Sequence, residues 1–119
     1  MDGGAAGDAS AGGLVPYCDA LQVVKDKCQR CHGDPLTHGA PVRFLSFEDF
    51  QEPYFTTEFK WWEVAADRVE SDVMPFVALN DPPTSLMPPV EPLTADEKVT
   101  LLGWLKQGAK PEGGTDCAP

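Results

Sequence analysis

Apolar residues recur at steps of three and four positions in three parts of the chain, and each part predicts a helix. The first part runs from residue 17 to 27, and its regularly spaced positions are Leu21, Val24 and Cys28. The second runs from about 57 to 71, with one face made of Phe59, Trp62, Ala66 and Val69. The third begins after residue 94, and its body contains Val99, Leu101, Leu102, Trp104 and Leu105.

The last of these helices has clear start and stop signals. Thr94-Ala95-Asp96-Glu97 is a capping box. In this motif the Thr94 hydroxyl accepts a hydrogen bond from the backbone N–H of Glu97, and the Glu97 carboxylate accepts one from the backbone N–H of Thr94. Gly108 is a suitable C-terminal stop, and Pro111 prevents the helix from continuing.

Between the helices the chain is rich in glycine and proline. The stretch from Gly33 to Pro41 predicts a loop, after which Ser46 predicts the N-cap of a short helix through Phe47 and Phe50. Prolines at positions 75, 82, 83, 88, 89 and 92 predict a loop in which neither a helix nor a central strand persists. No segment alternates with period two for long enough to indicate a sheet, so the predicted fold class is all-α.

The run Cys28-Gln29-Arg30-Cys31-His32 has the spacing C-x-x-C-H. Two thiols at this spacing can reach the two vinyl groups along one porphyrin edge, and the histidine that follows is carried beneath the iron, where its neutral nitrogen can bind. The motif therefore predicts one covalently bound haem c, held by Cys28 and Cys31, with His32 as an axial ligand of the iron.

Two other uses of the cysteine pair stay open besides a chance spacing. A thioredoxin-like redox pair expects a preceding strand in a βαβ context, whereas a helical pattern precedes Cys28. A zinc site needs two further ligands, and the remaining candidates are scattered: His38, Cys18 and Cys117. Haem attachment is favoured because neither alternative uses the adjacent histidine.

Size and charge fit a small acidic haem protein. At 119 residues, with 11 glycines and 12 prolines, the chain forms one domain with limited apolar material, and a haem would supply its centre. The net charge of −10 argues against nucleic acid as a ligand. It favours a redox partner with a basic docking surface, because opposite fields speed encounter, although acidity also serves solubility alone.

Residues 1–14 predict a flexible Gly/Ala-rich tether, followed by a haem domain at 15–119. The opening segment lacks the basic start and apolar centre of a signal peptide, and no stretch approaches the ~20 apolar residues of a membrane span. Such a tether suits a mature exported protein or one whose native precursor carries a lipid anchor. It suits an interdomain linker equally well.

Cys18 and Cys117 remain once the motif cysteines are assigned to haem. A disulfide between them would join the two ends of the domain, and the chain-entropy treatment of a ~100-residue loop gives ~4–5 kcal/mol as an upper value. The alternative is a pair of free thiols, which are a liability in the oxidising compartment that the haem interpretation implies.

The order of these features resembles the class I c-type cytochromes. Residues 17 to 112 are similar to small monohaem domains of exported or lipid-anchored bacterial proteins: a helix, C-x-x-C-H, a Gly/Pro loop, a middle helix, a Met-Pro loop and a capped helix ending in Gly-Ala. The resemblance implies a cytochrome c-like fold of three to four helices in a periplasmic or otherwise extracytoplasmic monomer. It also implies that the first and last helices cross, packing Leu21 and Val24 against Leu102 and Trp104.

A methionine is expected as the sixth ligand of the iron, since His/Met ligation is usual in c-type electron carriers. Met87, seven residues before Thr94, resembles the Met-Pro-Pro placement of the family, and the two following prolines fix its loop. Met74, which also precedes a proline, is the alternative and is otherwise expected to pack. His38 is expected at the surface, because it is too close to His32 in sequence to reach the opposite haem face.

Further residues are expected around the haem. Pro41 is the candidate whose carbonyl accepts from the second ring nitrogen of His32, as the corresponding proline does in similar small cytochromes, and Pro35 is the fallback. Candidates to contact the propionates are Arg43, Arg68, Trp61 and Trp62, although core packing explains the tryptophans better.

The expected function is one-electron transfer at the haem iron without substrate chemistry, so the chain is predicted to be a carrier and not an enzyme. One alternative is a haem-based ligand sensor or peroxidase-like domain, which needs an open or labile distal position. Another is the electron-entry module of a larger redox enzyme.

Overall fold

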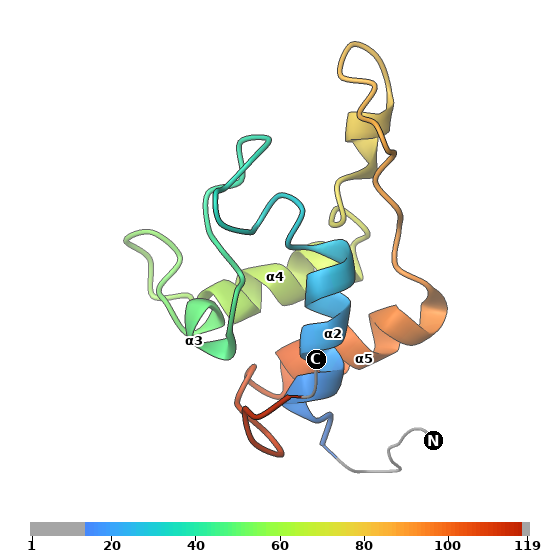
Figure 1. Cartoon of the computed structure of the whole chain (residues 1–119). Helices are drawn as coiled ribbons and strands as arrows, with labels where there is room; N and C mark the ends of the chain where they lie inside the picture. The colour runs from blue at the N-terminus through green and yellow to red at the C-terminus, as the bar shows by residue number, and fades with distance from the viewer. Residues whose placement is uncertain (1–13, 118–119) are drawn as a thin grey trace.

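The computed structural model describes residues 14–117, and this part of the chain is all-α, without strands. Its elements are α2 (Tyr17–Lys27), α3 (Phe47–Phe50), α4 (Trp61–Glu70), the 3₁₀ turn η1 (Val77–Asn80) and α5 (Ala95–Lys106). In Figure 1, α2 crosses α5, α4 runs beside α5, and two long loops extend from the same side of the helices. Apart from Leu14, the predicted tether lies outside the described residues.

The core lies where α2 crosses α5. Trp104 is fully buried, and its Nε1–H donates to the Lys110 carbonyl at 2.8 Å, so the buried indole keeps its polar atom bonded. Leu21 and Val24 of α2 are buried in the same cluster, with Leu102 half-buried beside it. The predicted packing of the first helix against the last is therefore confirmed.

The predicted bounds of α2, residues 17 to 27, are confirmed, as are the predicted start and stop signals of α5. At the start of α5, the Glu97 N–H donates to Thr94 Oγ1 at 3.1 Å, and the Thr94 N–H donates to Glu97 Oε1 at 2.9 Å. After α5, Gly108 has a φ of +105°, a backbone conformation that favours glycine. The local signals thus decide both boundaries of this helix.

The middle helix is shorter than predicted, because α4 begins at residue 61 and not at about 57. Residues 53–60 form a tight turn in which the Tyr54 N–H donates to the Phe59 carbonyl at 2.7 Å. The Thr57 hydroxyl donates to the Tyr54 carbonyl, also at 2.7 Å. These bonds within the turn compete with helix formation, so Phe59 lies outside α4.

The proline-rich stretch from 75 to 92 contains η1, although the sequence predicts no helix there; the turn fits the proline-free interval between positions 75 and 82. Asn80 then closes the loop on itself. Its side-chain N–H donates to the Val90 carbonyl at 2.9 Å, and its Oδ1 accepts from the Val90 N–H at 2.6 Å. Residues 81–89 therefore form a tip whose base is held by Asn80.

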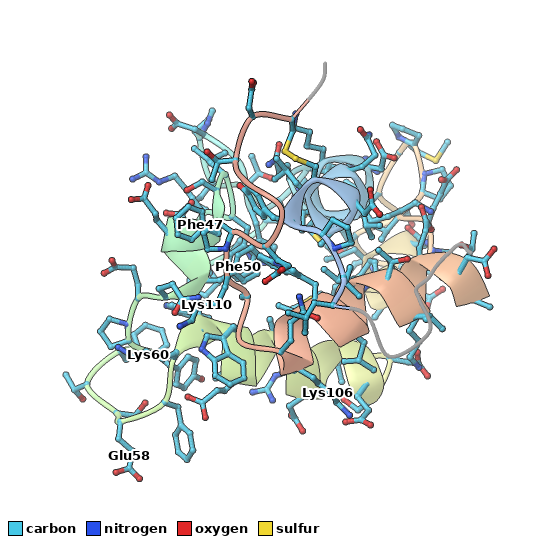
Figure 2. The ribbon with its side chains drawn as sticks, turned by 90° about the horizontal axis from the view of Figure 1, so that it is seen from below. Phe47, Phe50, Glu58, Lys60, Lys106 and Lys110 are labelled. Carbon is cyan, nitrogen blue, oxygen red and sulfur yellow. A yellow bond between two sulfur atoms is a disulfide. The ribbon has the colours of Figure 1, made fainter. Side chains whose placement is uncertain are left out.

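The two ends of the described chain are tied together. Cys18 and Cys117 form a disulfide with their Cα atoms 5.3 Å apart, visible as a yellow bond in Figure 2. The first N–H of α2 donates to the Glu112 carbonyl at 2.8 Å. The Gln107 side chain also bonds the backbone of Val15 twice, at 2.9 and 2.7 Å.

Replacing both Cys18 and Cys117 by serine is expected to lower the free energy of unfolding by about 2–5 kcal/mol, because the bridge closes a long loop in the unfolded chain. The two cysteines are 99 positions apart in sequence. Urea unfolding of the two proteins at neutral pH measures the difference. A difference below about 0.5 kcal/mol would mean that the hydrogen bonds of the tail hold the ends without the bridge.

An ion pair joins the end of α2 to the start of α5. Lys27 Nζ lies 2.9 Å from Glu97 Oε1, and the two side chains are only 12% and 23% exposed. Burial alone would raise the pKa of Glu97, but the bonds from the Thr94 backbone and from Lys27 outweigh it and hold the pKa below its ordinary value.

The lowered pKa of Glu97 predicts a contribution to stability that is present at neutral pH and lost on acidification. The unfolded chain takes up the proton first, so the contribution falls as the pH drops below about 4 and through the folded-state pKa. Glu97→Gln should reduce the free energy of unfolding by about 1 kcal/mol at neutral pH and by much less near about pH 3.

Urea unfolding at the two pH values measures this effect, with Asp96→Asn, an exposed carboxylate on the same turn, as the matched control. An equal loss for Glu97→Gln at both pH values would show that the charge of Glu97 is not responsible.

Candidate functional site

A cavity of about 320 Å³ lies at the C-terminal end of α2, within the size range of small-molecule and cofactor sites. Its walls come from the two long loops, from the turn at 53–60 and from α2, α3, α4 and α5. Most of the lining is apolar or aromatic and includes Val24, Phe44, Trp61, Val69 and Leu101. The three residues that define the C-x-x-C-H motif also line this cavity: Cys28, Cys31 and His32.

The motif continues from α2 as a tight turn. The His32 N–H donates to the Cys28 carbonyl at 2.9 Å, and the Cys31 N–H donates to the same oxygen at 3.2 Å. Gly33 follows where a side chain has no room, because a Cβ there would overlap the Gln29 carbonyl oxygen. A glycine directly after the C-x-x-C-H run is also part of the family pattern that this chain resembles.

The ring of His32 is oriented by the loop that follows. Its Nδ1 lies 2.8 Å from the Val42 carbonyl oxygen, which can only accept, so Nδ1 carries the proton. In the neutral ring Nε2 then keeps its lone pair. Burial lowers the pKa of His32 despite the bond to Val42, which favours this neutral form.

The sequence predicted Pro41 as the acceptor for His32, with Pro35 as the fallback. In the structure the acceptor is instead the carbonyl of Val42. The Phe44 N–H donates to the His32 carbonyl at 2.7 Å, and this bond sets the register of the loop against the motif. The register places the carbonyl of the residue after Pro41 opposite the ring, while Pro41 itself lines the cavity.

Burial, with smaller contributions from Cys31 and Glu97, raises the pKa of the Cys28 thiol to about 12. A cysteine that attacks disulfides usually has a depressed pKa, whereas the raised pKa of Cys28 favours the thiol over the nucleophilic thiolate. Among residues 14–117 there is also no group of three or more His, Cys, Asp or Glu side chains placed to share a metal ion.

The two candidate methionines have different surroundings. Met74, just after α4, is half-buried and lines the cavity. Met87 lies on the tip closed by Asn80, is 76% exposed and is not part of the cavity wall. The sequence preferred Met87 from its distance to α5, whereas the closed base of the tip keeps this residue away from the cavity and leaves Met74 beside it.

The charged side chains of the cavity wall are all basic, although the whole chain has a net charge of −10. They are Lys27, Arg30 and Arg68, and no aspartate or glutamate of the described residues joins them. Lys27 already pairs with Glu97 and Arg68 with Asp67, so these carboxylates offset part of the positive charge at the wall. Arg30 was not predicted as a site residue, because its only signal in the sequence is a basic residue between the two motif cysteines.

The remaining candidates divide between the cavity and the surface. Trp61 lines the cavity, but Trp62 does not, and Arg43 lies outside it, 3.9 Å from the Asp34 carboxylate. His38 is exposed, as expected, and sits at the cavity edge with its Nδ1 3.6 Å from Cys31 Sγ.

Fold and site together define an all-α domain with an apolar, basic-edged cavity beside a C-x-x-C-H turn. Comparison with known protein families, with curated proteins and with solved structures finds no match to this chain. None of the described helices has the length and apolar character needed to cross a membrane.

Proposed function

We propose that this chain is a monohaem c-type cytochrome domain that carries one electron at a time. The observation that carries the proposal is the arrangement around His32. This residue lines an apolar cavity beside two cysteine thiols, and its bond to Val42 leaves Nε2 with a lone pair for a metal.

The residues of the cavity wall fit a haem. Cys28 and Cys31 would hold its edge through thioether bonds, and His32 would ligate the iron. Arg68, on α4, would supply positive charge for the propionates, which need donors when they are partly buried. The bound haem supplies reversible Fe(III)/Fe(II) chemistry, while the apolar walls exclude water and keep the iron from external substrates.

For the sixth position we favour Met74, because it lines the cavity and Met87 is exposed on the tip. The thioether of a methionine stabilises ferrous iron and so raises the reduction potential. A coordinated methionine also leaves no open site for an external ligand, which favours a carrier over a ligand sensor or a peroxidase-like domain.

The disulfide and the net charge support a proposal for the cellular compartment of the protein and for the charge of its redox partners. The disulfide between Cys18 and Cys117 suits an oxidising, extracytoplasmic location such as the periplasm. The net charge of −10 favours donors and acceptors with basic docking surfaces, whether these are separate proteins or parts of a larger redox enzyme.

The proposal is tested on protein produced together with a c-type haem attachment system. We expect acidified solvent to leave the pigment on the denatured chain, and a redox titration to follow a one-electron curve. Pigment that washes out, or none at all, would contradict haem attachment. Rapid, tight binding of carbon monoxide to the reduced protein would instead favour the ligand sensor.

A further inference from the structure

The loop that carries Met74 is anchored at its far end by a lysine from another element. This loop runs from residue 71 to 94 between α4 and α5, and its cavity-lining residues are Met74, Pro75, Phe76, Leu79 and Val90. Near its end, Lys27 Nζ donates to the Pro92 carbonyl at 3.2 Å and lies 3.8 Å from Glu91. The same ammonium group pairs with Glu97 at the start of α5.

Lys27 is the last residue of α2 and directly precedes Cys28, so a single side chain connects three parts of the site. It joins the turn of the cysteine motif to the end of the methionine loop and to the first turn of α5. Its side chain is only 12% exposed, and water therefore screens its interactions less than those of a surface pair.

The other end of the loop is held mainly by its backbone, because the Val73 and Met74 N–H groups donate to the Arg68 carbonyl at 2.9 and 3.2 Å. Lys98 Nζ lies 2.9 Å from Asp72 Oδ1, but the Asp72 side chain is 79% exposed. Because Asn80 closes the tip on itself, the loop has internal bonds of its own and depends on its two ends for its position against the helices. Of these anchors, Lys27 is the one that reaches the loop from the motif helix.

We propose that Lys27 is a positioning residue for the far limb of this loop, residues 90–92, which forms part of the cavity wall. By holding residues 91 and 92 against the cysteine motif, it keeps this limb closed over the cavity and limits the access of external ligands. This inference rests on the proposed function, because it assumes that a haem occupies the cavity.

The test is a Lys27→Met variant of the haem-loaded protein, with imidazole as the probe of the ferric iron. We expect imidazole to bind about five- to thirtyfold faster than in the wild type, because loss of the anchor raises the open fraction of the loop. Hydrogen–deuterium exchange of residues 74–90 should speed up to a similar degree, while α3 stays unchanged. Lys27→Arg should restore most of the slow binding.

Lys106→Met is the matched control. Lys106, labelled in Figure 2, also makes a 2.9 Å ion pair, to Glu70, but both side chains are more than half exposed and neither contacts the loop end at 91 and 92. Its imidazole binding and loop exchange should equal those of the wild type.

The outcomes separate this inference from the proposed function. A haem-loaded Lys27→Met protein with wild-type imidazole binding and wild-type loop exchange would overturn the role of Lys27 and leave the carrier proposal intact. Wild-type protein without covalent haem would contradict the carrier proposal, and loop exchange alone would then decide whether Lys27 anchors the loop. If Lys27→Met does not accumulate, Lys27→Gln, which also removes the ammonium group that bonds residues 91 and 92, is measured in the same way.

Discussion

A Cys28→Ala/Cys31→Ala double variant should lose all covalently bound pigment. With both sulfurs gone, no thioether bond can form, and His32 alone leaves a haem that acidified solvent extracts. Absorption at haem wavelengths on the denatured, solvent-washed chain measures the effect, and the expected change is complete loss. Each single variant should keep one thioether bond and therefore retain its pigment after extraction.

The matched control for this prediction is the Cys18→Ser/Cys117→Ser variant. It removes the other two cysteines of the chain, which form the disulfide, and should keep the pigment bound while it lowers the stability of the fold. Pigment retained by the Cys28→Ala/Cys31→Ala variant would show that the motif does not attach it.

The Met74→Ala variant should lose the thioether–iron absorption band near the red end of the spectrum of the oxidised protein. Its reduction potential should fall by on the order of a few tenths of a volt, because a thioether favours ferrous iron and its replacement by water or another donor does not. An optical redox titration measures both effects on one sample.

Met87→Ala is the control, since it makes the same substitution on the exposed tip and should leave band and potential unchanged. The reverse result, with the band lost only in Met87→Ala, would mean that the tip opens at Asn80 when haem binds. Met87 would then be the ligand, as its spacing from Thr94 suggests.

Features set by neighbouring residues were the ones that the sequence predicted well. The bounds of α2 follow from apolar spacing, and the start of α5 follows from the reciprocal bonds of Thr94 and Glu97. The middle helix was predicted too long because spacing alone does not reveal that the Thr57 hydroxyl stabilises a competing turn.

Features that depend on contacts across the chain were harder to predict. Whether Pro41 or Val42 faces His32 depends on the bond from Phe44, twelve positions after the histidine. The surroundings of Met87 depend in the same way on the closure of its loop by Asn80, which no local pattern encodes. Proline content indicates a stiff loop but not the direction in which its side chains point.

The disulfide and the cavity lie at opposite ends of α2, because Cys18 belongs to its first turn and Cys28 follows its last residue. In Figure 1 the two long loops accordingly extend away from the end of α2 that bears the disulfide. A neighbour that contacts the domain close to the Cys18–Cys117 bridge would therefore lie at the end of α2 opposite the cavity. The end of α2 that carries the disulfide can thus be occupied while the cavity stays accessible to a partner.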